Sequence, residues 1–240
     1  MDDLLSSVVL NRQRGLDLEL TTIANNVANL ATAGFRREGL VFSEFVAATQ
    51  TGDSVSIGDL NGRFASSMPG PLSVTGRSFD LAIEGREGYF MLDRAGVPVL
   101  TRAGAFQISR EGVLVSPAGE PLLDTGGAPI LVPNDAGEIL IGADGTIAGA
   151  AGPIAQIAVM RPADGASIRA AGAAFITDQA PEPVEGARIR QGALEGSNVD
   201  PVTEIARMIE VTRSYERAQA LIEDHDSRIR NVLETLGRAV

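Results

Sequence analysis

The sequence contains no cysteine and no tryptophan, and only 4% of its 240 residues are aromatic. The absence of cysteine excludes thiolate catalysis, cysteine-based zinc sites and disulfide bonds. It does not fix a compartment, because a protein outside the cytoplasm can also do without disulfides. No run of about 18 apolar residues is present, so we expect no membrane insertion.

Positive charge is also scarce, since the formal net charge is −11. A phosphate-binding surface needs clustered basic residues, so this balance argues against nucleic acid as a partner. The chain opens with Met1-Asp2-Asp3 and lacks a basic segment followed by an apolar one. We therefore expect no cleaved secretory signal.

The C-terminal stretch carries a heptad pattern that predicts one long helix. Over residues 202–239 such a helix would be about 57 Å long at about 1.5 Å per residue, so its apolar stripe needs a helical partner. The two interleaved series of that stripe are Met208, Tyr215, Ile222, Ile229 and Leu236, and Val211, Ala218, His225, Val232 and Ala239.

The N-terminal stretch, residues 3–30, repeats this pattern and predicts a second helix. Gly34 lies just past the last periodic residue and is a plausible helix stop. Two such helices at opposite ends of the chain suggest that the termini come together. The heptad spacing does not decide whether they pair within one subunit, between subunits, or both. The heptad positions are Val9, Leu16, Ile23 and Leu30, with Leu5, Leu20 and Val27 between them.

The middle of the chain shows strand signals and no amphipathic segment of helix length. Phe79, Leu81 and Ile83 alternate with other residues, and Asp-Gly pairs separate later apolar runs. We predict an α+β fold, with long N- and C-terminal helices forming a coiled-coil-like helical domain and a central all-β domain of antiparallel strands. The predicted parts are residues 1–37 (helix and motif), 38–71 (linker with short strands), 72–194 (β domain) and 195–240 (C-terminal helix).

Three separated blocks resemble the signatures of the bacterial flagellar rod and hook proteins. One is residues 24–29 (Ala-Asn-Asn-Val-Ala-Asn) with Thr32 and residues 34–37 (Gly-Phe-Arg-Arg), where Arg36 stands in place of the usual Lys. The second includes residues 79–85 (Phe-Asp-Leu-Ala-Ile-Glu-Gly) and 101–106 (Thr-Arg-Ala-Gly-Ala-Phe). The third is residues 194–202 (Leu-Glu-Gly-Ser-Asn-Val-Asp-Pro-Val). On chemistry alone, the asparagine-rich block would indicate a frayed helix end and a turn.

The resemblance implies a structural subunit of the flagellar basal body, without cofactor or metal. It favours the proximal rod, with the distal rod as the alternative, because the chain is short and residues 208–213 lack the Gln usual in the distal type. The implied partners are other rod subunits and the flagellar type III export apparatus, and the implied location is the periplasm-spanning rod. The subunit would build a helical tube that transmits torque and encloses the export channel.

We expect subunit packing to depend on residues of the two helices and of the flanking motifs. Those residues are Leu16, Ile23, Asn25, Asn26, Val27, Asn29, Gly34, Phe35, Ser197, Asn198, Met208, Tyr215, Ile222, Ile229 and Leu236.

Two other classes of function stay open. One is a soluble β-rich binding module whose helices form an intramolecular coiled coil. The other is an enzyme, for which the sequence offers little. His225, the only histidine, lies at a heptad position and is better explained as a packing residue than as a pH switch. No serine has the glycine-flanked setting of a nucleophile elbow, and no phosphate loop or calcium loop is present.

Overall fold

The structure is a computed structural model that describes residues 2–48 and 54–237. The chain divides into two compact units. Unit 1 comprises residues 1–28, 38–64 and 200–240, and unit 2 comprises residues 29–37 and 65–199. The chain therefore passes between the units four times along its sequence.

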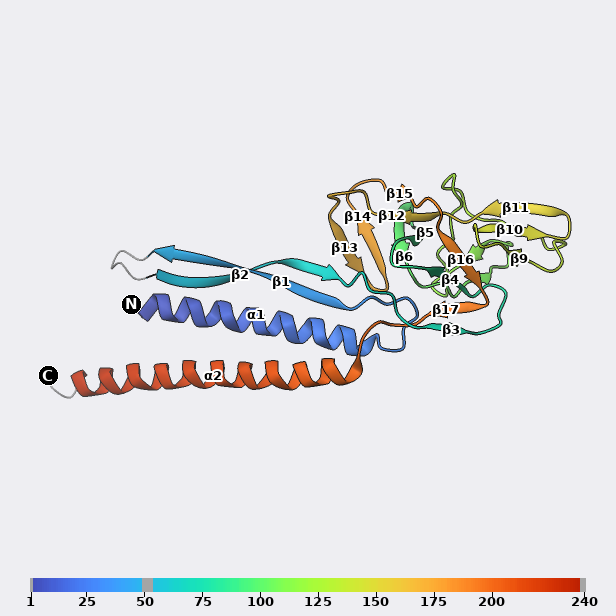
Figure 1. Cartoon of the computed structure of the whole chain (residues 1–240). Helices are drawn as coiled ribbons and strands as arrows, with labels where there is room; N and C mark the ends of the chain where they lie inside the picture. The colour runs from blue at the N-terminus through green and yellow to red at the C-terminus, as the bar shows by residue number, and fades with distance from the viewer. Residues whose placement is uncertain (1, 49–53, 238–240) are drawn as a thin grey trace. The chain divides into compact units, whose positions relative to one another are not determined.

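Unit 1 contains two helices and a β-hairpin. Helix α1 (Asp2–Ala28) packs against helix α2 (Pro201–Gly237) and against strand β1 (Glu38–Ala48), which pairs with β2 (Ser54–Ala65). Figure 1 shows the two helices side by side, with the hairpin along α1. Polar contacts between described residues also join the helices: Gln13 Nε2 donates to Gln219 Oε1 over 2.8 Å, Arg207 pairs with Glu19 at 3.2 Å, and Asn26 Nδ2 donates to Glu204 Oε2 over 3.2 Å.

Helix α2 turns its heptad stripe inward and leaves a second apolar stripe exposed. Within the stripe, Val211 and Ala218 are buried, and Met208, Tyr215 and Ile222 are half-buried. On the other side, Val202, Ile205 and Ile209 are 75%, 50% and 49% exposed. These three follow at steps of three and four, so they form one continuous strip along the helix.

Unit 2 is built from antiparallel strands around two hydrophobic clusters. Its largest sheet has the order β13-β14-β6-β5-β12-β15, and shorter sheets are β11-β10-β9, β16-β4, β17-β3 and β7-β8. The strands are β3 (Leu72–Val74), β4 (Leu81–Glu84), β5 (Tyr89–Arg94), β6 (Val97–Thr101), β7 (Gln107–Ile108), β8 (Leu114–Val115), β9 (Leu140–Ile141), β10 (Thr146–Gly149), β11 (Gly152–Gln156), β12 (Val159–Arg161), β13 (Ile168–Ala171), β14 (Ala174–Thr177), β15 (Glu182–Pro183), β16 (Arg188–Gln191) and β17 (Ala193–Glu195).

The core of unit 2 follows from the period-two pattern of the sequence. Leu81 and Ile83 of β4 are buried, as are Phe90 and Leu92 of β5. Phe90 meets Phe106 edge to face, with ring centroids 5.3 Å apart. This arrangement places the negative face of one ring against the positive edge of the other. In the second cluster, Phe175 meets Tyr89 edge to face at 5.7 Å, and most other buried side chains are aliphatic, which agrees with the low aromatic content.

The predicted fold class is wrong. The chain is mostly β: across the described residues, seventeen strands together hold more residues than the two helices. The helices also do not form a domain by themselves, because unit 1 includes the β1–β2 hairpin. Heptad spacing reports one face of one helix. It could not show that residues 38–65, assigned to a linker with short strands, form strands of 11 and 12 residues.

Neither helix of the described chain is long and apolar enough to cross a membrane.

Candidate functional site

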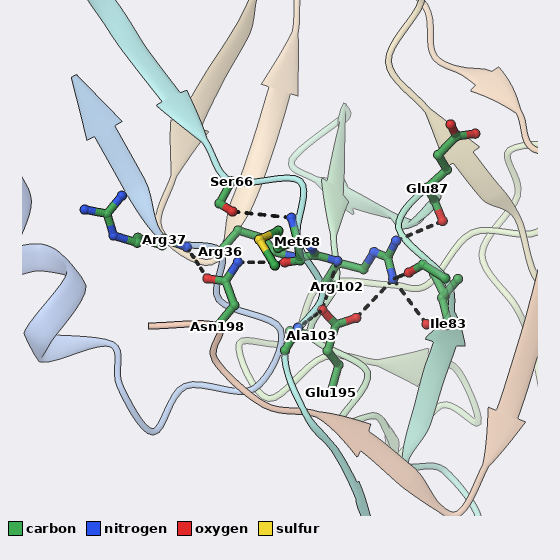
Figure 2. A network of polar contacts seen from close by, with 12 residues as sticks. Arg36, Arg37, Ser66, Met68, Ile83, Glu87, Arg102, Ala103, Glu195 and Asn198 are labelled. Carbon is green, nitrogen blue, oxygen red and sulfur yellow. Dashed lines mark hydrogen bonds and ion pairs between the residues drawn. The ribbon is translucent and has the colours of Figure 1, made fainter. Parts of the chain in front are cut away.

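Three segments of unit 2 connect directly to unit 1 in sequence, and they meet in one place. They are residues 29–37, 65–71 and 195–199, and we call them the connecting segments. Asn198 binds two others: its Oδ1 accepts from the Arg37 amide over 2.6 Å, and its Nδ2 donates to the Met68 carbonyl over 2.6 Å. Figure 2 shows both bonds. The Ser66 amide also donates to the Arg37 carbonyl over 2.8 Å.

A buried ion cluster lies beside these bonds. One Oε of Glu195 pairs with Arg36 Nη2 at 2.9 Å, and the other pairs with Arg102 Nη1 at 3.0 Å. All three side chains are at most 1% exposed. Because desolvated charges attract strongly but are costly to bury, the geometry of such a cluster decides its contribution to stability.

Arg102 is well satisfied in this cluster. Its guanidinium donates to three carbonyls of the β4–β5 connection, those of Ile83, Gly85 and Glu87, over 3.2, 3.1 and 2.8 Å. It also lies 5.4 Å from the ring centroid of Tyr89, within cation–π range. Burial lowers the pKa of Arg102, while the charge of Glu195 opposes that shift. An arginine nevertheless stays protonated in proteins.

Arg36 is satisfied much less well. Its ion pair with Glu195 lacks hydrogen-bond geometry, and none of its three guanidinium nitrogens has a hydrogen-bond partner among the described residues. The cluster therefore holds two buried cations and one anion, with its unmet hydrogen-bonding capacity concentrated on Arg36. A buried donor without an acceptor lowers the free energy of unfolding, which means that it destabilises the folded protein.

We call residues 72–194 of unit 2 the β body, and the backbone of the first connecting segment approaches it closely at Gly34. Its φ is +69°, a conformation that favours glycine. A Cβ at this position would lie 2.2 Å from the backbone nitrogen of Ala103. The Gly34 amide donates to the Glu195 carbonyl over 2.8 Å. The motif glycine is thus required by backbone contact; the predicted role as helix stop is wrong, because α1 ends at Ala28.

Unit 1 has its own buried polar group, centred on Asn26. The Asn26 Oδ1 accepts from the Glu38 amide over 2.9 Å, and its Nδ2 donates to the Glu38 carbonyl over 2.9 Å. The same Nδ2 donates to Glu204 Oε2 over 3.2 Å. Asn26 and Glu204 are both fully buried. One amide therefore joins α1, β1 and the first turn of α2.

Asp200 forms the cap that starts α2. Its carboxylate accepts from the amides of Val202 and Thr203, each over 3.3 Å, and from the Thr203 hydroxyl. Pro201 follows as the first helical residue, where its missing N–H has no cost. The hydrogen bond from the Thr203 hydroxyl, with smaller contributions from the two amides, lowers the pKa of Asp200.

The structure places the predicted packing residues in both units. Fully buried are Ile23, Asn26, Gly34 and Phe35; half-buried are Leu16, Asn25, Val27, Asn29, Ser197, Asn198, Met208, Tyr215 and Ile222. The side chains of Ile229, Leu236 and His225 lie outside the described residues. The role of the set in subunit packing stays a prediction.

Sequence reasoning missed the charged residues of the two buried polar groups: Arg36, Glu38, Arg102, Glu195 and Glu204. Arg102 and Glu195 stand inside the motif blocks, surrounded by small and apolar residues. Charged residues in such settings are almost never fully buried unless they are paired. That setting was the available signal, although nothing in the sequence indicated which partner each residue has.

The described residues contain no group of three or more metal-ligating side chains. A pocket of about 390 Å³ next to Phe79 and Phe106 has one charged lining residue, Arg77. It therefore lacks the paired titratable groups from which an acid–base site would be built.

Two family models match the chain. One is described as flagellar basal body rod FlgEFG protein C-terminal and matches residues 190–235. The other is described as flagellar hook protein FlgE/F/G D1 domain and matches residues 82–149. The first therefore includes Glu195 and Asn198, and the second includes Arg102.

Curated relatives match over nearly the whole length. The flagellar basal-body rod protein FlgF of Caulobacter vibrioides is 37% identical over 96% of this chain and 97% of its own. FlgF of Rhizobium meliloti is 36% identical over 96% of both chains. The flagellar basal-body rod protein FlgG of Bacillus subtilis is 28% identical over 93% of this chain and 96% of its own.

Proposed function

The chain belongs to the FlgF family of flagellar basal-body rod proteins and is a structural subunit of the rod, and we propose that its terminal helices drive assembly. In this proposal, copies of the chain pack with one another and with other rod subunits through α1 and α2. The β-rich unit 2 makes further lateral contacts. The 28% identity to FlgG, against 37% to FlgF, favours the proximal over the distal rod.

The observation that carries this proposal is the exposed apolar strip of α2. Val202, Ile205 and Ile209 are each about half exposed or more, although α1 already covers the neighbouring heptad stripe. A strip of apolar side chains on a helix is stabilised when another element removes it from water, by about 25 cal/mol per Å². Helices of neighbouring subunits would provide that cover.

The symmetry of a rod follows from such contacts. Subunits joined by different surfaces, related by a rotation that does not close, generate a helical filament. A filament with the helices inside would be a tube, and the tube would transmit torque and enclose the export channel. Packing is then the mechanism, and the protein needs no cofactor and no catalytic activity.

The proposed location is the periplasm-spanning part of the rod. The subunit would reach it through the flagellar type III export apparatus, without a cleaved signal peptide. The remaining packing residues, including Leu16, Asn25, Met208 and Ile222, would hold each subunit's helices in the arrangement that neighbours recognise.

Assembly can be tested at the exposed strip. Ile205→Glu places a charge at a site that is 50% exposed in the single chain, so the variant should fold with unchanged helicity and thermal stability. In the rod, the same charge would be buried without a partner, which is costly. We expect basal bodies from cells with this variant to lack the protein by mass spectrometry, and motility to be lost.

Glu210→Lys is the matched control, because Glu210 is exposed on α2 outside the strip. This variant should assemble normally. Rods containing the Ile205→Glu protein at wild-type amounts would refute assembly through this strip. A wild-type protein absent from basal bodies would instead favour a soluble β-rich module.

A further inference from the structure

One residue, Glu195, belongs to the third connecting segment and contacts the other two segments and the β body. It belongs to the segment 195–199, and its carboxylate pairs with Arg36 of the first segment at 2.9 Å. The same oxygen accepts from the Gly70 amide of the second segment over 3.0 Å. The other oxygen pairs with Arg102, which is bound to the β4–β5 connection.

The backbone of Glu195 repeats the same connection. Its carbonyl accepts from the Gly34 amide, so the first segment is bound by both the main chain and the side chain of this residue. The next residue, Gly196, donates its amide to the Pro71 carbonyl over 2.8 Å. Asn198 also joins the segments to one another, but its side chain binds Arg37 and Met68, which both belong to the connecting segments.

We propose that Glu195 is the common anchor of the three connecting segments, so that loss of its charge releases all three from the β body together. Its side chain accepts hydrogen bonds from Arg102 and from the Gly70 amide and forms an ion pair with Arg36, and a buried carboxylate has enough acceptor sites for these contacts. This role concerns positioning within one subunit and does not depend on the proposed packing between subunits.

The charge of Glu195 is essential to this role. Two guanidinium groups with no exposed surface face the carboxylate, and replacing it with an amide would leave both cations buried without a counter-ion. Removing one partner of a buried ion pair is far more damaging than replacing the whole group. The amide nitrogen of a glutamine would also place an N–H donor against the N–H donors that now face the carboxylate.

The chain supplies a matched control in Glu84. This residue also binds two arginines, with 2.7 Å to Arg190 and 3.7 Å to Arg188. Its side chain is 34% exposed and those of its partners are more than half exposed. Exposed ion pairs contribute little to stability. Glu84→Gln therefore removes a carboxylate that pairs with two arginines, as Glu195→Gln does, but at a partly exposed site.

The test is hydrogen–deuterium exchange of the full-length chain, read by mass spectrometry of its peptides. In Glu195→Gln we expect peptides from residues 29–37, 65–71 and 195–199 to exchange faster together, on the order of 100-fold. Peptides of β5 and β6 should keep their protection. Glu84→Gln should leave the exchange of all three segments unchanged.

Faster exchange in only one segment, or in none, would overturn the proposal, as would an equal effect of Glu84→Gln. If Glu195→Gln does not fold by circular dichroism, Glu195→Asp decides the question. Aspartate keeps the negative charge but is one methylene shorter, so it cannot reach Arg36, Arg102 and the Gly70 amide at once. All three segments should then exchange faster by about tenfold, and a smaller or single-segment change would count against the anchor.

Discussion

Asn26 and Glu204, 178 positions apart in sequence, are joined by a hydrogen bond of 3.2 Å inside unit 1, with both side chains fully buried. The same amide satisfies the backbone N–H and C=O of Glu38. The motif asparagine therefore substitutes for a missing partner strand at the first residue of β1, and at the same time binds the start of α2.

We predict that Asn26→Leu will destabilise unit 1 strongly. The substitution leaves two buried backbone groups of Glu38 without their partner, and each such group costs about 1–3 kcal/mol. Chemical unfolding followed by far-UV circular dichroism measures the change. Asn11→Ala, at an exposed position of α1, should change the free energy of unfolding by no more than about 0.5 kcal/mol. Equal effects of the two variants would contradict this account of Asn26.

Gly34→Ala should be far more damaging than Gly76→Ala. Both glycines have nearly the same φ, +69° and +72°, so both variants incur the left-handed strain of about 1–2 kcal/mol. A Cβ at Gly76 would meet no atom within 4 Å, whereas at Gly34 it would overlap the backbone of residues 102 and 103. We expect an additional loss of about 1–3 kcal/mol or more at Gly34, measured by thermal unfolding. Similar melting temperatures for the two variants would show that the close approach is unimportant.

The two buried arginines should respond in opposite ways to replacement by methionine. Arg36→Met removes the poorly satisfied cation and leaves Glu195 paired with Arg102, so stability should be unchanged or slightly increased. Arg102→Met strips three backbone carbonyls of their donor and should cost about 3–5 kcal/mol. Urea unfolding of both variants gives the comparison, and a larger loss for Arg36→Met would reverse our assignment.

The cap of α2 predicts a pH dependence. The folded-state pKa of Asp200 is lowered by its hydrogen bonds, chiefly that from the Thr203 hydroxyl. The cap therefore contributes stability that is present above the unfolded pKa, near about 3.9, and is lost as pH falls through the lower folded value. The gap in melting temperature between wild type and Thr203→Val should be constant above about pH 5 and shrink under acid. In an Asp200→Asn background, where position 200 cannot titrate, a gap that still shrank would contradict this cause.

Periodicity located the two helices but not their surroundings. The heptad residues predicted helices over 3–30 and 202–239, and α1 and α2 lie at those places. The same pattern could not show that one stripe of α2 turns toward α1 while Val202, Ile205 and Ile209 stay exposed, because both stripes are apolar. It also gave no sign that β1 joins α1, and the predicted fold class failed for that reason.

The candidate site was predictable in its parts and not in its connections. Gly34, Asn26 and Asn198 were singled out by the motif blocks, and each makes a hydrogen bond or a close backbone approach to a segment distant in sequence. Their partners lie far away in sequence, such as Glu195 for Arg36. Local patterns carry no information about such pairs, because tertiary contacts alone decide them.

The four passages of the chain between its two units have a mechanical consequence. Two units joined by a single flexible connection can rotate relative to each other, because the φ and ψ angles of the connection change when a twist is applied. Here several connections act in parallel. In unit 2, the Glu195 carboxylate of one connecting segment contacts the other two. In the proposed rod, we expect a twist applied to the helices of a subunit to be divided among these covalent connections.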